Sequence, residues 1–442
     1  MTTPQRAAVD EHIERLRAVL AEALRDRDSH VLEIETDPLV GHVSANSLTA
    51  PGALPHFDNS QMDGYAVRGQ DVDLGEEGAA VLLLSGVVPA GSPAHKLRDG
   101  TAVAVMTGSP IPAGADAVIP VEKAADGFAS LEAWDAGHDA QVRFVDVSPA
   151  DLQPGRYIRR AGSDVSLGDT VIEAGEMLTP ARLGMLAACG FDRIPVLRPI
   201  RALVVSTGSE VRAPGEELGS GELYDANSVL IRAALESFGH SVVTVRVGSD
   251  DPAYFLQEVN AALADGRPQV VVTAGGVSAG AFEVVRQGLE DHGVNFAPIA
   301  QQPGGPQGWG LLPVPGREVP AAFIGLPGNP VSCAVSLETL LRPALSALDP
   351  ACPPPSWVTV RLGVSMTSPG GVRQFRRVQL SGDDADHRLA HPVGGAGSHL
   401  LGHMARADAL LMLDEEDQDV CAGALRRALL LPGAATAPRQ QS

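Results

Sequence analysis

Lysine is nearly absent from this chain of 442 residues. Only Lys96 and Lys123 are present, so arginine carries almost all of the positive charge. Lysine and arginine together number 33 against 54 aspartates and glutamates, which gives a net charge of −21. A chain this acidic repels phosphate backbones and anionic lipids, so the composition argues against nucleic acid or a membrane surface as the main partner.

Cysteines are also few, and long hydrophobic runs are missing. The four cysteines, at positions 189, 333, 352 and 421, are far apart, with no CxxC pair and no histidine pair nearby. This spacing excludes a zinc site and a disulfide framework and is typical of a reducing compartment. The first residues lack a hydrophobic signal core, and no run approaches the length of a membrane span. We therefore expect a cytoplasmic protein that does not insert into membranes.

The chain does contain enough apolar material for several cores. Hydrophobic residues make up 44% of the sequence, and 442 residues exceed the size of one core. We expect an α/β plus β fold with a central parallel-sheet α/β domain, a β-rich insert domain and a small C-terminal β-barrel. The expected domains are a discontinuous packing domain (5–54 with 164–199), the β-rich domain (55–163), the α/β domain (200–348) and the barrel (356–432).

The α/β domain is most clearly marked by the stretch from Val270 to Gly280, VVVTAGGVSAG. Its uninterrupted apolar run, 270–273, predicts a strand buried on both faces. Gly275 and Gly276 then allow the backbone to turn sharply and to approach a ligand closely. Helical spacing of apolar residues follows over 281–291. A strand, a glycine loop and a helix in this order are a common place for an anionic ligand at the carboxyl edge of a parallel sheet.

Two similar units lie on either side of this stretch in the sequence. In the first, an apolar run at 202–205 leads into Ser206, Thr207 and Gly208. In the second, an apolar run at 323–326 leads into a turn and then a helix; the turn and helix carry Pro327, Gly328, Asn329, Pro330 and Ser332. Because the carboxyl ends of parallel strands meet at one edge of a sheet, we expect the three loops to converge.

Acidic side chains stand near the same strand ends. The carboxylates are Glu210, Asp250 and Glu283, with the hydroxyls of Thr207, Ser278 and Ser332 on neighbouring loops. Hard oxygen ligands of this kind suit Mg²⁺, which usually also binds water and a substrate phosphate. A metal would also offset the repulsion between these carboxylates and phosphates. The alternative is that the residues cap helices and bind no ligand.

Polar clusters also occur outside the α/β domain. Asp58, Asn59, Ser60 and Asp63 lie within six positions, either as a turn-rich crossover or as a dense set of ligand-binding groups. Three arginines at 156, 159 and 160 precede Asp164 and suit either an anionic ligand or an ion-paired strand edge. The residues alone leave both pairs of alternatives open.

Six motifs of the chain, in the same order, resemble those of the molybdopterin molybdenumtransferases, the bacterial relatives of the gephyrin E domain. They are Phe57-Asp-Asn-Ser-Gln-Met-Asp-Gly-Tyr-Ala-Val67, Met106-Thr-Gly108, Ser206-Thr-Gly208 with Glu210, Tyr224-Asp-Ala-Asn227, Gly275-Gly-Val-Ser278 and Gly325-Leu-Pro-Gly-Asn-Pro-Val-Ser332. The resemblance implies an elongated, four-part subunit that forms a homodimer through the packing domain. It also implies an enzyme that uses Mg²⁺, cleaves adenylated molybdopterin, inserts molybdate and releases AMP, in a cleft shared between subunits.

The resemblance also assigns roles to individual positions. It implies catalytic roles for Asp63, Thr107, Asp164 and Glu210, and metal binding by Glu210, Asp250 and Glu283. The positions that it implies for substrate binding are Ser206, Thr207, Gly275, Gly276, Ser278, Pro327, Gly328, Asn329, Ser332, Arg373, Arg377 and Ser398.

The chain departs from the family pattern in one loop. Relatives carry lysines where this sequence has Pro298, Gln302 and Gly305. Because molybdate is a dianion, losing these charges should weaken its binding, unless arginines such as 286, 317, 373 or 377 compensate. Two hypotheses follow: an active molybdenum-inserting enzyme, or a gephyrin-like scaffold that lost the chemistry and binds a receptor or cytoskeletal peptide.

Overall fold

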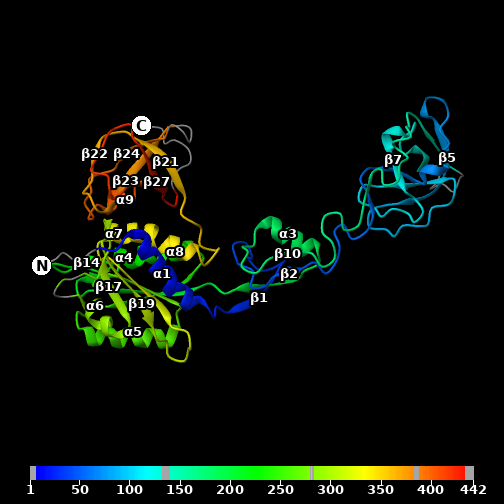
Figure 1. Cartoon of the computed structure of the whole chain (residues 1–442). Helices are drawn as coiled ribbons and strands as arrows, with labels where there is room; N and C mark the ends of the chain where they lie inside the picture. Colours follow the sequence, from blue (N-terminus) through cyan, green and yellow to red (C-terminus); the bar gives the residue numbers. More distant parts are fainter. Residues whose placement is uncertain (1–5, 132–139, 279, 281–282, 383–387, 434–442) are drawn as a thin grey trace.

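The computed structural model describes residues 6–131, 140–278, 280, 283–382 and 388–433. The chain forms an elongated subunit (Figure 1). An α/β unit lies beneath a C-terminal barrel at one end, a β-rich unit lies at the other end, and a small unit connects them. The expected multidomain, elongated α/β plus β fold is confirmed.

A six-stranded sheet forms the centre of the α/β unit, in the order β15-β12-β16-β20-β19-β17. The strands are β12 (Arg201–Thr207), β15 (Ser241–Val247), β16 (Val270–Ala274), β17 (Val294–Pro298), β19 (Pro306–Leu312) and β20 (Ala321–Leu326). The first four in spatial order are parallel, as expected. The sheet as a whole is mixed, because β19 pairs antiparallel with both β20 and β17. A short connection without a helix joins β19 to β20, and such connections make antiparallel pairs.

Helices cover both faces of this sheet. One face packs against α1 (Val9–Leu24), α4 (Ala226–Ser237), α7 (Pro330–Ser336), the π-helix η5 (Leu337–Leu341) and α8 (Arg342–Ser346). The other face packs against α5 (Pro252–Gly266) and α6 (Val284–Leu289), with a short 3-10 turn η4 (Glu290–His292) after α6. The helix expected over 281–291 therefore begins at Val284; residues 281 and 282 lie outside the described ranges.

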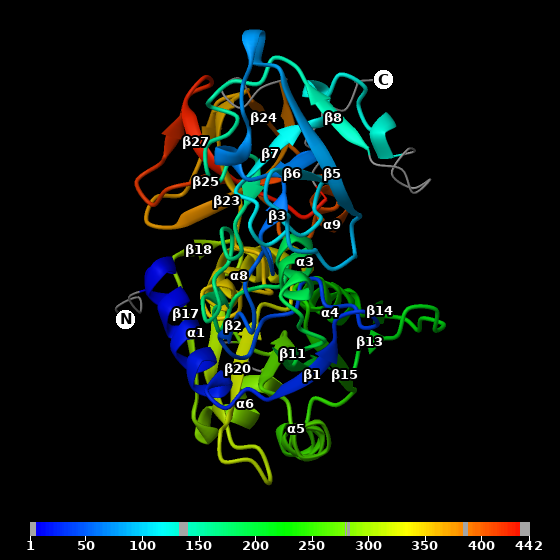
Figure 2. The same cartoon turned by 90° about the vertical axis from the view of Figure 1, so that its right-hand side faces the viewer.

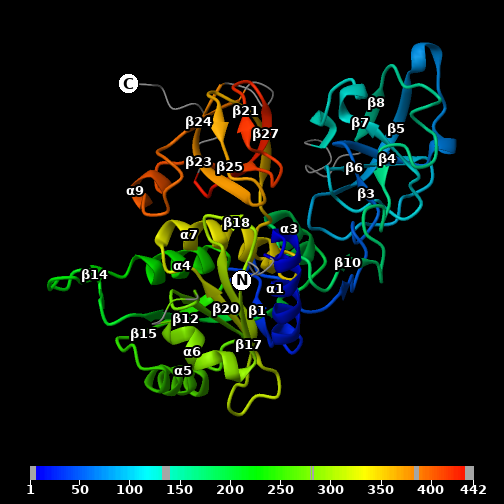
Figure 3. The same ribbon diagram turned by 60° about the vertical axis from the view of Figure 1, so that its left-hand side comes forward.

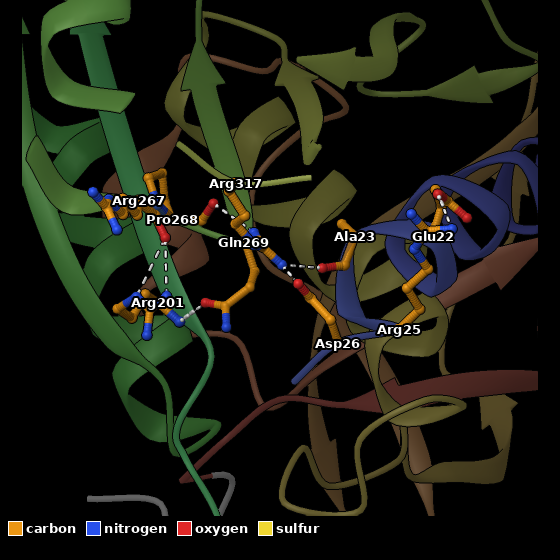
Figure 4. A network of polar contacts seen from close by, with 9 residues as sticks. All are labelled: Glu22, Ala23, Arg25, Asp26, Arg201, Arg267, Pro268, Gln269 and Arg317. Carbon is orange, nitrogen blue, oxygen red and sulfur yellow. Dashed lines mark hydrogen bonds and ion pairs between the residues drawn. The ribbon is translucent and has the colours of Figure 1, made fainter. Parts of the chain in front are cut away.

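Helix α1 belongs to the core of the α/β unit. Its apolar stripe, including Leu16 and Leu20, packs with Val272 and Ile324 of the central sheet. Arg317 fixes its end by donating to the Ala23 carbonyl at 2.8 Å and by pairing with Asp26 at the amino edge of the sheet (Figure 4). The sequence interpretation included this helix in the packing domain of residues 5–54; its core contacts in the structure are with the central sheet of the α/β unit.

The connecting unit and the β-rich unit have separate cores. The connecting unit comprises β1 (Ser29–Glu33), β2 (Leu48–Thr49), β10 (Thr170–Ile172), α3 (Pro180–Ala188) and β11 (Arg193–Leu197). The β-rich unit is built on the five-stranded sheet β7-β4-β6-β5-β8 and a two-stranded ribbon, β3 with β9. Its strands are β3 (Asn59–Ser60), β4 (Gly64–Val67), β5 (Ala80–Val88), β6 (Thr101–Val105), β7 (Ala117–Pro120), β8 (Gln141–Phe144) and β9 (Ile158–Arg159), with short turns η1 (Gly69–Asp71), η2 (Glu76–Gly78) and η3 (Val121–Lys123).

The C-terminal unit is a closed barrel. Its strands pair in the ring β23-β24-β21-β27-β25, and β25 pairs back with β23. The elements are β21 (Trp357–Leu362), β22 (Met366–Thr367), β23 (Arg373–Ser381), β24 (Leu389–Pro392), α9 (Leu401–Met404), β25 (Ala409–Leu413), β26 (Asp419–Val420) and β27 (Leu425–Leu430). The barrel joins the α/β unit through β18 (Gln301–Gln302), which runs parallel to the start of β23 (Figure 3). Within the described ranges, none of the helices has the length and hydropathy needed to cross a membrane.

Candidate active site

A pocket with a volume of about 730 Å³ opens at the carboxyl edge of the four parallel strands. It is formed by the loops that follow β12, β15, β16 and β20, together with β14 (Leu223–Tyr224) and the start of α4. A two-residue strand β13 (Val211–Arg212) pairs with β14 at its rim. The convergence of loops expected from the sequence is thus confirmed. The expected site residues that line it are Ser206, Thr207, Glu210, Asp250, Gly275, Gly276 and Gly328.

Glycine is required where two of these loops touch. Gly275 has a φ of +92°, and a Cβ added to Gly328 would come within 3.0 Å of the Gly275 Cα. A Cβ on Gly276, whose φ is +65°, would lie 2.9 Å from the Val285 backbone nitrogen. The backbones of two loops and the start of α6 therefore pack directly on one another, which only glycine permits.

Glu210 and Asp250 place two carboxylates in this pocket. The Glu210 carboxylate lies over Gly208, where a Cβ would come within 2.5 Å of its Oε2. Asp250 accepts a hydrogen bond from the Ser209 hydroxyl at 2.7 Å. Both side chains are exposed, and neither one caps a helix. The capping explanation therefore does not account for them.

Capping does account for three neighbouring polar residues. Asp225 accepts from the Ser228 amide and caps α4, and Asp251 accepts from the Ala253 amide and caps α5. Asn329 accepts from the Val331 amide and caps α7. Asn329 was expected to bind substrate, but its side chain already has this local role.

Glu283 lies in an adjoining hollow rather than in the pocket with the other two carboxylates. Its carboxylate accepts hydrogen bonds from the hydroxyl and the amide of Ser278. The hollow has a volume of about 200 Å³, includes Pro327 and shares Gly275, Gly276 and Gly328 with the main pocket. Across the described ranges, no three His, Cys, Asp or Glu side chains are close enough together to bind one metal ion. The expected three-carboxylate metal site is therefore not assembled in this conformation.

The loop without lysines runs along the adjoining hollow, which Pro306 lines. Buried amides hold this loop in place. Gln307 donates to the Gly304 carbonyl at 2.8 Å and to the Ser336 hydroxyl at 2.9 Å. The exposed Gln302 accepts from Gln374 of the barrel at 2.7 Å. The buried Ser332 lies under this loop, since a Cβ on Gly304 would come within 3.3 Å of the Ser332 carbonyl oxygen.

The arginines considered as substitutes for those lysines have other partners. Arg373 pairs with Asp10 at 2.8 and 3.0 Å and with Glu415 at 3.3 Å. Hydrogen bonding to Asp10 is the largest influence that raises the pKa of Arg373. Arg286 of α6 pairs with Glu290 in the turn η4 that follows, and Arg317 lies at the opposite edge of the sheet (Figure 4).

Arg377 and Ser398 lie on the barrel, outside the main pocket. Arg377 is buried, donates to the Gly395 carbonyl and has a buried Nε atom without a partner. Burial lowers the pKa of its guanidinium, and the neighbouring Arg376 adds to this effect. Ser398 is half-buried in the turn before α9. Arg377 therefore has spare donor capacity, and in the described part of the chain the buried Nε of Arg373 also lacks a hydrogen-bond partner.

Asp63 and Thr107 lie together, but far from the main pocket of their own chain. The amide and the hydroxyl of Thr107 donate to Asp63 at 2.6 and 2.8 Å, and these bonds lower the pKa of Asp63. Both belong to the β-rich unit, which stands away from the α/β unit in Figure 1 and comes to the front when the molecule is turned (Figure 2). Asp164 is exposed in the segment that leaves this unit. In the polar cluster nearby, Asp58 pairs with Arg160 at 2.6 Å.

The sequence reasoning missed Asp225 and Asn227 as pocket residues. Asp225 is 2% exposed and pairs with Arg246 at 3.4 Å. Asn227 donates to the Gly328 carbonyl at 2.7 Å, and its own Oδ1 is buried without a hydrogen-bond partner. The signal was present in the Tyr224-Asp-Ala-Asn227 motif, which contributed to the resemblance but to no site assignment.

Three family models match the chain. The MoeA N-terminal region (domain I and II) matches residues 7–190, the probable molybdopterin binding domain matches 203–347, and the MoeA C-terminal region (domain IV) matches 359–430.

Proteins with similar sequences are named molybdopterin molybdenumtransferases. Molybdopterin molybdenumtransferase 2 of Mycobacterium tuberculosis is 40% identical over 399 residues, which are 87% of this chain and 91% of that protein. Molybdopterin molybdenumtransferase of Haemophilus influenzae is 32% identical over 386 residues, 86% of this chain and 89% of that protein. A crystal structure of the molybdopterin biosynthesis MoeA protein from Pyrococcus horikosii superposes with a TM-score of 0.77 at 25% identity, over 97% of this chain and 100% of that one.

Proposed function

The chain belongs to the molybdopterin molybdenumtransferase family, and from this premise we propose that it inserts molybdate into adenylated molybdopterin with release of AMP. It is a transferase of molybdenum cofactor biosynthesis. The observation that carries the detailed reaction is the pocket at the carboxyl edge of the central sheet. It brings glycine loops, hydroxyls and the carboxylates of Glu210, Asp250 and Asp225 to one place, which suits a large phosphorylated substrate.

Different residues of this pocket are suited to bind different parts of the substrate. The half-buried loop of Gly275 and Gly276 lines the pocket and offers a backbone that a pyrophosphate can approach closely. The unpartnered Oδ1 of Asn227 and the carboxylate of Asp225 line the inner wall, where they can accept from ring nitrogens of the pterin. The pocket volume of about 730 Å³ lies within the range of ligand sites, roughly 300–1,000 Å³.

Glu210 and Asp250 are the residues that would hold Mg²⁺. Two carboxylates in one pocket suit this ion, which typically takes one or two protein carboxylates and completes its shell with water and substrate phosphate. When bound, it would neutralise charge on the substrate phosphates. Glu283 could join them only by leaving Ser278, to which it now accepts two hydrogen bonds.

A homodimer would complete the site. Asp63 and Thr107 belong to the β-rich unit, which stands away from the α/β unit in Figure 1, so they cannot meet the pocket of their own chain without a large movement. A two-fold partner can bring the same residues to that pocket, since each surface of a symmetric dimer is used twice. We propose that the acidic group of one subunit and the Asp63–Thr107 pair of the other act on one substrate.

The reaction is tested by mixing the purified protein with adenylated molybdopterin, Mg²⁺ and molybdate and measuring AMP. AMP release that depends on molybdate is the expected result. Absence of turnover at every molybdate concentration would refute the proposed reaction. The names of the relatives favour this enzyme over the peptide-binding scaffold that the missing lysines suggested.

A further inference from the structure

A second, separate pocket lies at one end of the C-terminal barrel. Its volume is about 350 Å³, and it shares no residue with the pocket of the central sheet. Its walls include Met366, Arg376, Asp419, Val420 and Cys421, which define the barrel-mouth pocket. The short ribbon of β22 and β26 forms one side of it. The mouths of β-barrels are places where ligand sites commonly occur.

Arg376 points into this mouth from inside the barrel. Side chains on a strand alternate between faces, so Arg376 shares the face of Val378, which is fully buried in the barrel core. Arg376 also stands opposite Leu411, another residue of that core. The neighbours Phe375 and Arg377 take the other face, where Phe375 packs against α7.

The Arg376 guanidinium has little compensation for its charge. Its one hydrogen bond among the described residues goes to the Gln374 side chain at a long 3.4 Å, and no described carboxylate forms an ion pair with it. Burial lowers its pKa. Two other arginines of the barrel are better satisfied, since Arg373 pairs with Asp10 and Arg426 pairs with Asp417 at 2.6 Å. A half-buried cation without an anion is costly, so this position is suited to an anionic ligand.

The other walls narrow the chemistry of that ligand. Asp419 is exposed on the same pocket without a described partner, and the two charges do not pair with each other. A dianion such as phosphate would be repelled by Asp419, whereas a ligand with one anionic and one cationic group would satisfy both. Met366 and Val420 are 6% and 4% exposed and supply an apolar floor from the barrel core.

We propose that the barrel-mouth pocket binds a small zwitterion with an apolar body, of the class of an apolar α-amino acid. Its carboxylate pairs with Arg376, its ammonium group pairs with Asp419, and its apolar part packs on Met366 and Val420. This site is independent of the proposed transferase reaction.

The rate at which Cys421 is alkylated reports whether a ligand occupies the pocket. Cys421 lines the pocket and is exposed, whereas the other three cysteines are buried, so a thiol reagent should modify it selectively. L-leucine is the probe. 4-Methylpentanoate, which lacks the ammonium group, and isoamylamine, which lacks the carboxylate, are its comparators. Leucine should slow the alkylation of Cys421 in a saturable manner, 4-methylpentanoate should do so more weakly, and isoamylamine should have no effect.

Two variants test which side chain binds each charged group of the ligand. Arg376→Gln should weaken protection by leucine about tenfold or more, because a charge-assisted hydrogen bond in a partly dry pocket is lost. Asp419→Asn should weaken protection by leucine but not by 4-methylpentanoate. Arg406→Gln removes the same charge from an exposed position of the same unit and should leave protection unchanged. Thermal unfolding shows whether each variant is folded.

The proposal is overturned if leucine gives no saturable protection of the unaltered protein. It is also overturned if inorganic phosphate protects as well as leucine, or if Arg376→Gln and Arg406→Gln behave alike. Because the three small molecules are compared on the unaltered chain, the result does not depend on the folding of any variant.

Discussion

The separation of Asp63 from Glu210 within one chain predicts that two inactive variants restore each other's activity. Asp63→Asn removes a carboxylate of the β-rich unit, and Glu210→Gln removes one from the sheet pocket. Each variant alone should lose nearly all turnover, because every composite site carries one defect. Both side chains are exposed, so we expect the free energy of unfolding to change by less than about 1 kcal/mol in either case.

The size of the recovery follows from symmetry. Random pairing of equal amounts of the two chains makes about half of the dimers mixed, and in each mixed dimer one site has both defects while the other has none. Co-expression should therefore restore about one quarter of the unaltered turnover, measured as AMP release. Mixed dimers are isolated with two different affinity tags, and in that pure fraction the recovery should approach about one half.

A reciprocal mixture provides the control. When a chain carrying both substitutions is paired with the unaltered chain, every site of a mixed dimer has one defect, and the purified mixed dimer should be inactive. If each site instead lay within one chain, this mixed dimer would retain about half of the turnover and the complementing pair would retain none. That pattern would refute the shared site.

Three further predictions test the local structure. Gly276→Ala should destabilise the fold by about 2–4 kcal/mol in denaturant titrations and abolish turnover, because the added Cβ meets the start of α6. Gly175 has a similar positive φ but open space around it, so Gly175→Ala should cost only about 1 kcal/mol. Equal costs for the two variants would contradict the close packing at Gly276. Gln302→Lys with Gly305→Lys should lower the KM for molybdate about threefold to tenfold without changing the melting temperature. Gly305 directly precedes Pro306, which lines the adjoining hollow, and a Cβ at 305 meets only ordinary contacts; an unchanged KM would show that the loop does not bind the anion. Burial raises the pKa of Asp151, but hydrogen bonds from Lys123 and Ser148 outweigh this effect and lower the pKa from its ordinary 3.8 to about 2. The stabilisation is therefore present above pH 4 and lost as the pH falls toward 2, so Asp151→Asn should cost about 1–2 kcal/mol at pH 7 and almost nothing near pH 2; a constant difference would contradict this linkage.

Much of the α/β unit was predictable because its signals are local. The apolar run before Gly275 predicted a buried strand, and the observed β16 extends the expected range by one residue. The turn at Pro327-Gly328-Asn329 was equally readable, since proline and glycine restrict the backbone directly. Parallel pairing then brought these loops to one edge, as expected.

Other features depended on contacts between distant segments. The sequence could not reveal that β19 runs antiparallel to β20, since the direction of a strand depends on how the chain returns to the sheet. Nor could it reveal that Arg373 is already paired with Asp10, because 363 positions separate the two. The sequence analysis therefore counted Arg373 as a free positive charge, whereas an ion pair already neutralises it.

The sequence by itself determined which groups the site contains, because glycine, proline and the charged residues act through their own backbone and side-chain chemistry. Tertiary structure alone decided which of them meet. It placed Glu210 and Asp250 in one pocket, turned Glu283 toward Ser278, and set the β-rich unit that holds Asp63 apart from that pocket. Distances between distant residues depend on the packing of whole units, and no local pattern records that packing.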